Sequence, residues 1–348
     1  MSITINQSEM RYDTLKQKWT VIAPERAVRP SDFITHRKEL LSDDKTKFCP
    51  FCPGNEKSTT KELLRLNGDE NGDWSLRVVA NKYPAFRIEG NLKREGYGVY
   101  DKVTGIGAHE VIVETPAHEL SLTDYSIKTL YNLFYAFKER MLDLKRDIRF
   151  RYIFAFKNYG HKAGATLVHP HSQIIAMPVI PDTVVSMLRS SREYYEKKER
   201  CIVCDILDME FRSGNRIVFE NADFVALCPY ASFFSFETRI YPTKHSHDFT
   251  LINDDGLLSL AGIVKETLVR LDKSLVGPHL NIVLHTSPPT NERPSHPDYW
   301  KSIAYDYHWH LEIIPRISGY AGFEWATGFN INIVRPEESA KFLRDVSV

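Results

Sequence analysis

The chain has 348 residues, of which 43% are hydrophobic and 26% charged, a balance typical of a soluble globular protein with a full core. Its 45 Lys and Arg residues equal its 45 Asp and Glu residues. The chain therefore lacks the excess of positive charge that would indicate a nucleic-acid or membrane partner. No run approaches the roughly 18 apolar residues of a membrane span. The start, MSITINQSEM, has no basic or apolar signal-peptide region, so we expect a cytoplasmic protein.

The first half of the chain contains features that indicate strands and one long helix. Apolar and polar residues alternate in HEVIVETPAH, as in a half-buried strand, and the alternation ends at a proline. The next segment is helix-like and begins with polar capping residues. In chain order the features are a C-x-x-C pair at Cys49 and Cys52, a strand over 109–118, a helix over 121–144, a strand over 150–158 and an H-x-H strand over 169–175.

The same order of features returns in the second half. Glu110 precedes the last histidine of its strand by eight residues, and Glu237 does the same in FETRIYPTKH. Five features in matching order predict an internal duplication, although antiparallel sheet-and-helix patterns also resemble one another by chance. The second series is a C-x-x-C pair at Cys201 and Cys204, a strand over 236–245, a helix over 252–275, a strand over 279–287 and an H-x-H strand over 308–314.

These patterns predict the fold class. Strands separated by single long helices are typical of an α+β protein and not of a doubly wound α/β fold. We expect two duplicated domains of antiparallel sheet with helices packed on it, over residues 1–190 and 191–348. The boundary should fall in the charged segment RSSREYYEKKER, which is either a helix or a linker.

Each half also offers a complete set of zinc ligands. Zinc usually takes four cysteine and histidine ligands in structural sites, where no coordination position stays open. In a reducing compartment a C-x-x-C pair is typical of a metal site or a redox dithiol. We therefore expect two structural zinc ions per chain; the alternative is free thiols and solvated histidines, and His247 competes with His245. The expected ligands are Cys49, Cys52, His118 and His169 in the first site and Cys201, Cys204, His245 and His308 in the second.

If His169 binds a metal, His171 is left for another role. Residues i and i+2 of a strand face the same side, so the metal would hold the strand end that carries His171. A neutral imidazole with a pKa of about 6.5 is a competent nucleophile near neutral pH, and phosphorus is an electrophile that forms a labile adduct with it. Gln173, on the same side, could donate to a phosphate oxygen. A second metal ligand or a packed core histidine are the alternatives for His171.

HPHSQ, with the upstream C-x-x-C pair, resembles the galactose-1-phosphate uridylyltransferase family of the histidine-triad superfamily. Its transferase branch has glutamine where the hydrolase branch has a third histidine. The segments KWTVIAPERAVRP, VVANKYPAF, FKNYGHKAGATLVHPHSQ and SGYAGFEWATG resemble the same family. The resemblance implies that His171 is the catalytic nucleophile, assisted by Gln173. It implies contacts to the nucleotide or sugar by Arg26, Arg29, Asn81, Asn158, Gly164, Ala165, Thr166, Gln173, Phe323 and Glu324.

The resemblance implies a two-step transfer of a nucleoside monophosphate between a nucleotide sugar and a hexose 1-phosphate, through a nucleotidyl-histidine. Backbone amides of Gly164–Thr166 would stabilise the phosphoryl oxygens, and the protein would be a homodimer with shared sites. The galactose enzymes hold iron with a glutamate that would lie near Met187. This chain instead has the second C-x-x-C pair, which is similar to the ADP-glucose phosphorylase subgroup with two zinc ions. Glu312 replaces glutamine in the second half, and an anion would repel phosphate, so we expect that half to be non-catalytic.

Three functions follow from these patterns as hypotheses. Uridylyl transfer from UDP-glucose to a hexose 1-phosphate, a step of galactose metabolism, is the first, because most of the family carries it out. Adenylyl transfer from ADP-glucose to phosphate is the alternative. A zinc-stabilised nucleotide-binding protein without catalysis is a hypothesis of another class. A hydrolase is disfavoured because Gln173 stands where the hydrolase branch of the superfamily has a third histidine.

Overall fold

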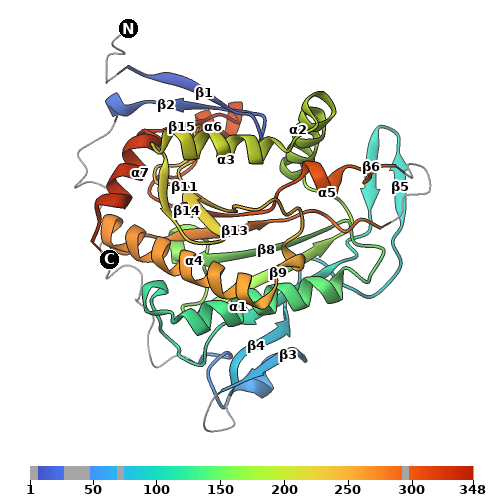
Figure 1. The fold of residues 1–348 in the computed structure, drawn as a ribbon. Coiled ribbons are helices and arrows are strands. Elements are labelled where there is room, and N and C mark those ends of the chain that lie inside the picture. The colour runs from blue at the N-terminus through green and yellow to red at the C-terminus, as the bar shows by residue number, and fades with distance from the viewer. Residues whose placement is uncertain (1–6, 27–47, 69–73, 292–297, 348) are drawn as a thin grey trace.

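A computed structural model describes residues 7–26, 48–68, 74–291 and 298–347, and a ten-stranded antiparallel sheet forms its centre (Figure 1). This sheet contains strands from both halves of the chain. In each H-x-H motif the second histidine is the first residue of a strand, and the first histidine lies two residues before it. In sheet order the strands are β10 (Ile217–Glu220), β11 (Phe224–Leu227), β12 (Thr238–Pro242), β14 (His310–Pro315), β13 (Leu280–His285), β8 (Tyr152–Tyr159), β9 (His171–Met177), β7 (Ala108–Val113), β4 (Trp74–Ala80) and β3 (Glu62–Asn67).

The two halves of the sheet have the same topology. From the outer edge to the centre the first half has the order β3-β4-β7-β9-β8, and the second has β10-β11-β12-β14-β13. In each half the fifth strand therefore lies between the third and the fourth. The two fourth strands, β8 and β13, pair with each other, with Leu280 opposite Tyr159. The expected α+β fold with a duplicated unit is confirmed, and this pairing joins both units in one continuous sheet.

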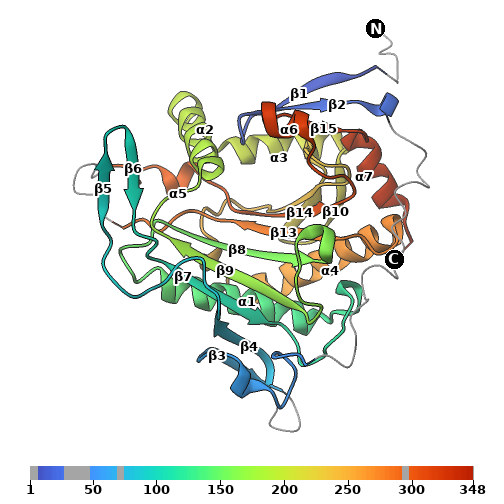
Figure 2. The same ribbon diagram turned by 180° about the vertical axis from the view of Figure 1, so that it is seen from behind.

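One long helix connects the third and fourth strands of each half. Helices α1 (Ile127–Leu144) and α4 (Asp254–Leu275) cover the same face of the sheet, as Figure 2 shows from behind. The side chain of Ser126 accepts a hydrogen bond from a backbone amide in the first turn of α1, and Asn253 does the same for α4. Such caps satisfy amides that have no partner within the helix. Both expected helices are confirmed, with starts a few residues later than the sequence pattern indicated.

Two further helices cover the other face of the second half. α2 (Asp182–Lys198) and α3 (Ile202–Ser213) pack against apolar side chains that include Val225 and Tyr241. The charged segment RSSREYYEKKER falls mostly within α2, so residue 190 lies inside a helix. The division of the chain at 190 stays a prediction.

Smaller elements surround the central sheet. A three-stranded sheet contains β1, β2 and β15, and the hairpin of β5 and β6 projects from the body of the molecule (Figures 1 and 2). The bounds are β1 (Glu9–Asp13), β2 (Lys18–Ile22), β5 (Arg94–Tyr97), β6 (Tyr100–Val103), α5 (Ile303–Asp306), α6 (Gly322–Thr327), β15 (Asn330–Asn332) and α7 (Pro336–Asp345).

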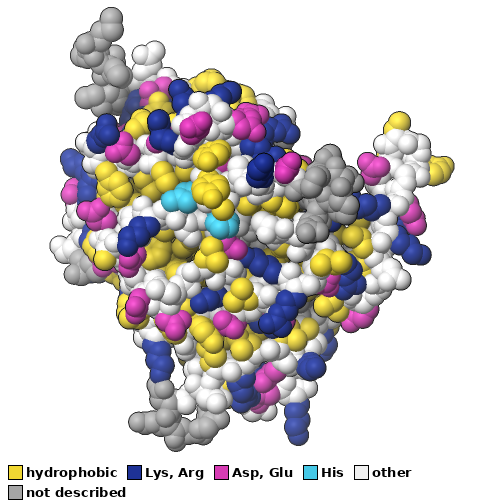
Figure 3. Space-filling view, turned by 45° about the vertical axis from the view of Figure 1, so that its right-hand side comes forward, with side chains coloured by type: hydrophobic (Ala, Val, Ile, Leu, Met, Phe, Trp, Pro, Cys, Tyr) yellow, Lys and Arg dark blue, Asp and Glu magenta, His cyan; other side chains and the backbone are white. Residues whose placement is uncertain are grey.

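The surface carries both signs of charge. On the face that Figure 3 shows, basic and acidic side chains are interspersed with hydrophobic ones, and neither sign forms a continuous patch. This mixture agrees with the equal numbers of cationic and anionic residues in the sequence. Within the described part of the chain, every helix is too short or too polar to cross a membrane.

Candidate functional site

The first metal cluster joins three distant segments of the first half. Cys49 and Cys52 lie near the start of the described segment 48–68, His118 follows β7, and His169 precedes β9. The Cys52 sulfur lies 3.2 Å from Nδ1 of His118 and 3.7 Å from Nδ1 of His169, and Cys49 lies 3.7 Å from the latter nitrogen. Zinc bonds of about 2.3 Å to sulfur and about 2.0 Å to nitrogen place tetrahedral ligands about 3.5 Å apart. The spacing therefore fits a tetrahedral metal ion.

The second cluster repeats this arrangement. The Cys204 sulfur lies 3.5 Å from Nδ1 of His245 and 3.6 Å from Nδ1 of His308, and Cys201 lies 4.0 Å from the latter nitrogen. His245, not His247, takes part. Among the described residues, the groups of Cys, His, Asp and Glu close enough to hold a metal ion are these two Cys2His2 sets. His285 and His310 belong to neither set; their rings stack on each other with centroids 4.7 Å apart.

Backbone carbonyls orient the metal-facing histidines. Nε2 of His169 lies 2.8 Å from the Thr115 carbonyl, and Nε2 of His308 lies 3.0 Å from the Pro242 carbonyl. A ring nitrogen that donates to a carbonyl leaves the other nitrogen free to bind a metal, which is how proteins usually fix the tautomer of a metal-binding histidine. Both clusters thus present Nδ1 with its lone pair toward the two sulfurs.

His171 begins β9 and is held by the residue two positions before it. Its Nδ1 lies 2.9 Å from the His169 carbonyl, so Nδ1–H donates there and Nε2 keeps its lone pair. The Phe51 ring contacts both His169 and His171, with centroid distances of 5.9 Å to each. Burial lowers the pKa of His171, against the opposing effect of its hydrogen bond to the carbonyl, and Lys157 lowers the pKa further. A neutral imidazole with a fixed tautomer is the state that a nucleophile requires.

A buried ion pair supports His171 from the helix-covered face of the sheet. Lys157 and Glu114 are both almost fully buried, and Nζ of Lys157 lies 2.8 Å from a carboxylate oxygen of Glu114. The same ammonium group donates to the His171 carbonyl at 3.2 Å, and Ser172 and Tyr125 donate to the Glu114 carboxylate. These contacts fix the backbone at the start of β9. None of these contacts is among the predictions made from the sequence.

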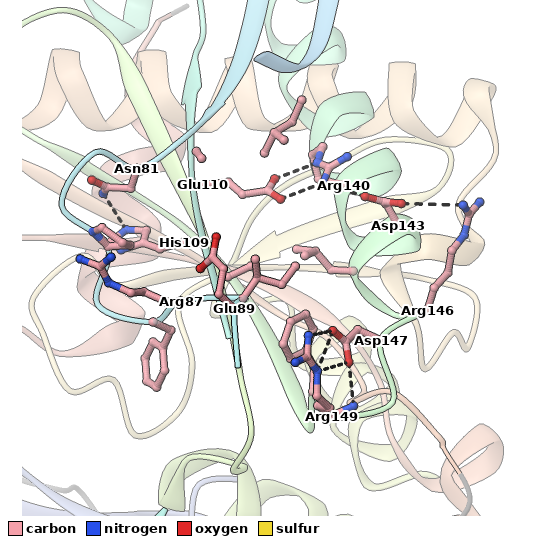
Figure 4. A pocket seen from close by; sticks show the side chains of 18 of the residues that line it. Asn81, Arg87, Glu89, His109, Glu110, Arg140, Asp143, Arg146, Asp147 and Arg149 are labelled. Carbon is pink, nitrogen blue, oxygen red and sulfur yellow. Dashed lines mark hydrogen bonds and ion pairs between the residues drawn. The ribbon is translucent and has the colours of Figure 1, made fainter. Parts of the chain in front are cut away.

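Gln173 is connected to the loop that follows β4. Its Oε1 lies 2.7 Å from Nε2 of His109 on β7, and the Asn81 side-chain amide lies 3.1 Å from the same nitrogen. Figure 4 shows Asn81 and His109 together at one end of a cavity of about 850 Å³. At the other end of this cavity Glu110, Arg140 and other charged side chains form ion pairs with one another. The structure therefore brings Asn81 and Gln173 together through His109, which is not among the site residues predicted from the sequence.

The glycine-containing loop lies beside the end of β8. The Asn158 side chain there accepts a hydrogen bond from Asn281 of β13 at 2.8 Å, so the second half of the chain orients it. The Gly164 and Ala165 amides donate to carbonyls within the loop, at 2.9 and 3.2 Å. A tight turn therefore uses these two amides internally in this conformation, and their role in stabilising phosphoryl oxygens stays a prediction. Thr166 follows in the same loop.

The remaining predicted substrate residues lie elsewhere. Arg26 ends a short helical turn after β2, and Phe323 and Glu324 belong to α6. Both segments lie at the top of Figure 1, whereas β9 lies in the lower half of the molecule. Within one chain the structure therefore does not bring these residues next to His171. Arg29 lies outside the described residues.

The counterpart of His171 in the second half is His310, which lies in a buried ionic cluster. Glu312 there takes the place of Gln173, and Lys16 and Arg239 both contact its carboxylate. Burial alone would raise the pKa of Glu312, but these two cations hold it well below its usual range. Lys16 comes from the turn between β1 and β2, and its ammonium group also lies over the Phe233 ring, 4.7 Å from the centroid. This arrangement supports the expectation that the second half is not catalytic.

The strand register corrects one detail of the predicted repeat. Val111 lies opposite Gln173, and Arg239 lies opposite Glu312. Glu237, two residues before Arg239, is therefore the counterpart of His109 and not of Glu110. Glu110 points to the other face of the sheet, where it forms an ion pair with Arg140 of α1. The shared eight-residue spacing suggested the wrong correspondence, because the second half has one residue fewer between these strand positions and the metal-binding histidine.

Comparisons with known proteins agree with this geometry. The family profile described as galactose-1-phosphate uridyl transferase, N-terminal domain, matches residues 1–181. The chain is 36% identical to ADP-glucose phosphorylase of Arabidopsis thaliana over 346 residues, which cover 99% of this chain and 94% of that protein. It is 28% identical to galactose-1-phosphate uridylyltransferase of Thermotoga maritima over 349 residues, which cover 98% of this chain and 99% of that protein.

Solved structures give the same result. Arabidopsis thaliana ADP-glucose phosphorylase with bound ADP-glucose has a TM-score of 0.82 at 32% identity, and the match covers 98% of this chain and 100% of that one. A structure of uridylyltransferase has a TM-score of 0.71 at 26% identity, with 97% of each chain covered. Sequence and structure thus match over nearly the whole length. The chain belongs to the galactose-1-phosphate uridylyltransferase family of nucleotidyltransferases.

Proposed function

We propose that this protein transfers a nucleoside monophosphate from a nucleotide sugar to a second phosphate-bearing acceptor, through a covalent intermediate on His171. The hydrogen bond from Nδ1 to the His169 carbonyl carries this proposal, because it leaves a buried, neutral Nε2 as the nucleophilic atom. Lys157 and the first metal cluster hold both ends of the short segment around it.

The reaction has two steps, and in each of them one bond to the α-phosphorus forms while another breaks, so that no cofactor has to supply or accept electrons. Nε2 of His171 attacks the α-phosphorus, the bond to the bridging oxygen breaks, and the hexose 1-phosphate leaves with the electron pair. A phosphate oxygen of the acceptor then attacks the same phosphorus and releases Nε2. The Gln173 amide donates to a non-bridging oxygen while charge develops there. The Nδ1 proton stays on the ring, donated to the His169 carbonyl, throughout.

The donor is proposed to be UDP-glucose, with a hexose 1-phosphate as acceptor, because most of the related proteins are galactose-1-phosphate uridylyltransferases. ADP-glucose with phosphate as acceptor is the second candidate. It is favoured by the 36% identity to an ADP-glucose phosphorylase and by a similar structure that contains ADP-glucose.

Donor labelling distinguishes these reactions. We expect ³²P at the α-phosphate of the true donor to remain on the denatured protein when acid is avoided, whereas ¹⁴C in its glucose is lost, because the sugar phosphate leaves in the first step. UDP-glucose and ADP-glucose are compared at equal concentration. Label from the adenine donor alone would rule out the uridylyl reaction. No retained label from either donor would contradict nucleotidyl transfer and favour a non-catalytic binding protein.

The metal at both clusters is proposed to be zinc. Two thiolates and two imidazoles in tetrahedral spacing are the donor set that zinc prefers, and all four positions are filled by protein. The role is therefore structural, and neither ion takes part in the chemical steps. Reduced cysteine pairs as metal ligands also support the cytoplasm as the proposed location.

We also infer a homodimer with shared sites. The support is that Arg26, Phe323 and Glu324 lie far from His171 in one chain, and that Trp325 of α6 is 80% exposed. Mixing His171→Gly subunits with Glu324→Ala subunits is expected to restore part of the activity, because one mixed site then contains both natural residues. Sedimentation should give twice the mass of 40.2 kDa. A monomeric mass, or no recovery after subunit exchange, would contradict shared sites.

A further inference from the structure

We propose that His109 is a positioning residue for the transfer step. It fixes the side-chain amide of Gln173 so that the NH2 group, and not the carbonyl oxygen, faces the reacting phosphate. This inference rests on the proposed function and extends it to a residue that neither touches the phosphate nor belongs to a metal cluster. His109 lies on β7, two residues before Val111, which is paired with Gln173.

The contacts of His109 define its proton arrangement. The Ala85 backbone amide lies 3.2 Å from Nδ1, and a backbone N–H can only donate, so Nδ1 accepts. A neutral imidazole that accepts at Nδ1 carries its proton on Nε2. This N–H donates to Oε1 of Gln173, and the 2.7 Å between Nε2 and Oε1 is the shortest hydrogen-bond distance of the ring. With its oxygen held in this way, the Gln173 amide must direct its two hydrogens away from His109.

Asn81 completes the arrangement. Its Oδ1 accepts from the Tyr83 amide at 2.9 Å, which places its NH2 group 3.1 Å from Nε2 of His109. Both groups are donors there, so the Asn81 hydrogens stay available for another acceptor. An oxygen of the bound nucleotide is such an acceptor. The loop from Asn81 to Ala85 thus sets the tautomer of His109, and His109 sets the orientation of Gln173.

The orientation of Gln173 decides the sign of its effect on the reaction. A side-chain amide offers two hydrogens on one side and an acceptor oxygen on the other. Aimed at a phosphoryl oxygen, the NH2 group stabilises the developing charge, whereas the carbonyl oxygen repels it. Without a donor at His109, both orientations become populated. The second half has Glu237 at the corresponding position, where it pairs with Arg239 instead.

Two conservative substitutions separate the contacts of His109. The shorter side chain that His109→Asn introduces would reach only the former Nδ1 position, so this variant keeps an acceptor for Ala85 and loses the donor to Gln173. His109→Gln extends an NH2 group to the former Nε2 position and keeps that donor. The measurement is the rate of nucleotidyl-His171 formation from the α-³²P donor in rapid-quench experiments. Both variants are also made in a Gln173→Ala background, which forms a double-mutant cycle.

We expect His109→Asn to slow label formation about tenfold with KM changed less than about twofold, the loss that one hydrogen bond to a transition-state group produces. His109→Gln should recover most of the rate. In the Gln173→Ala background His109→Asn should have no further effect, because the group that it positions is gone. A purely structural role would instead slow both backgrounds equally.

Three results would overturn the inference: a His109→Asn rate within about twofold of wild type, equal losses in both backgrounds, or no recovery with glutamine. Failure of the proposed function is recognisable separately, because wild type would then acquire no label at all. Metal content and Tm of each variant check that the fold is intact, and both are expected to equal the wild-type values.

Discussion

Replacing His171 by glycine is expected to abolish covalent labelling by the nucleotide donor and to lower turnover by roughly 100,000-fold or more, the scale seen when a covalent nucleophile is removed. The reason is that a glycine at this position offers no side-chain atom that can attack phosphorus. Metal content should remain at two ions per chain, because His171 directs Nδ1 to a carbonyl and belongs to neither Cys2His2 cluster. Labelling is measured with α-³²P donor, and metal content by elemental analysis.

His310→Gly is the matched control, because His310 occupies the same position of the H-x-H motif in the second half. This substitution removes a fully buried ring and is expected to lower stability, yet labelling should persist below the new Tm. Full labelling of His171→Gly would show that another residue is the nucleophile. If His310→Gly lost the label although its fold is intact, the second half would also take part in the chemical reaction.

The metal ligands could be predicted from the sequence because two of them in each site are close together along the chain and because the pattern occurs twice. A C-x-x-C pair fixes two thiols close together whatever the rest of the fold does, and the second copy indicates which of 13 histidines are the partners. The structure groups the predicted sets, including His245 in preference to His247. The two long helices and the sheet class were predictable for a similar reason, since apolar spacing follows the period of each element.

The support of the site could not be predicted in the same way. The partner of His171 is the His169 backbone carbonyl, and a sequence gives no signal for a backbone contact. Lys157 did leave a signal, since it stands in FRYIFAFKN at an alternation position that faces the helices. A lysine there requires a buried anion, but Glu114 lies 43 residues away and only the pairing of strands brings the two together.

The error over Glu110 and Glu237 has a physical cause of the same kind. Faces of a strand alternate with every residue, so one deleted residue in a loop moves all aligned side chains to the opposite face. Only the hydrogen-bonded register, with Arg239 opposite Glu312, shows which residues correspond. His109 escaped notice because its partner Gln173 belongs to another strand.

Removing either metal is expected to have the second large effect, with different consequences in the two halves. Structural zinc contributes about 10–16 kcal/mol to the folding of small zinc domains, as much as the roughly 5–15 kcal/mol that stabilises a typical protein. Burial, together with a hydrogen bond to Cys49, raises the pKa of the Cys52 thiol to about 11, so metal binding must displace a proton and weakens as the pH falls. Cys52→Ser and Cys204→Ser should each lower zinc from two ions to one and Tm by roughly 10 °C or more.

The two variants should nevertheless differ in activity below their Tm. His169 connects the first metal to the nucleophile, since its ring faces the two sulfurs while its carbonyl holds Nδ1 of His171. Loss of that metal frees the carbonyl to move, so Cys52→Ser should lose labelling. The second metal instead anchors His308, whose neighbour His310 lies within the buried cluster of Lys16 and Glu312, so Cys204→Ser should still label. Wild-type protein with less than one zinc per chain would contradict both sites, and equal loss of labelling in the two variants would contradict the division between a catalytic and a structural half.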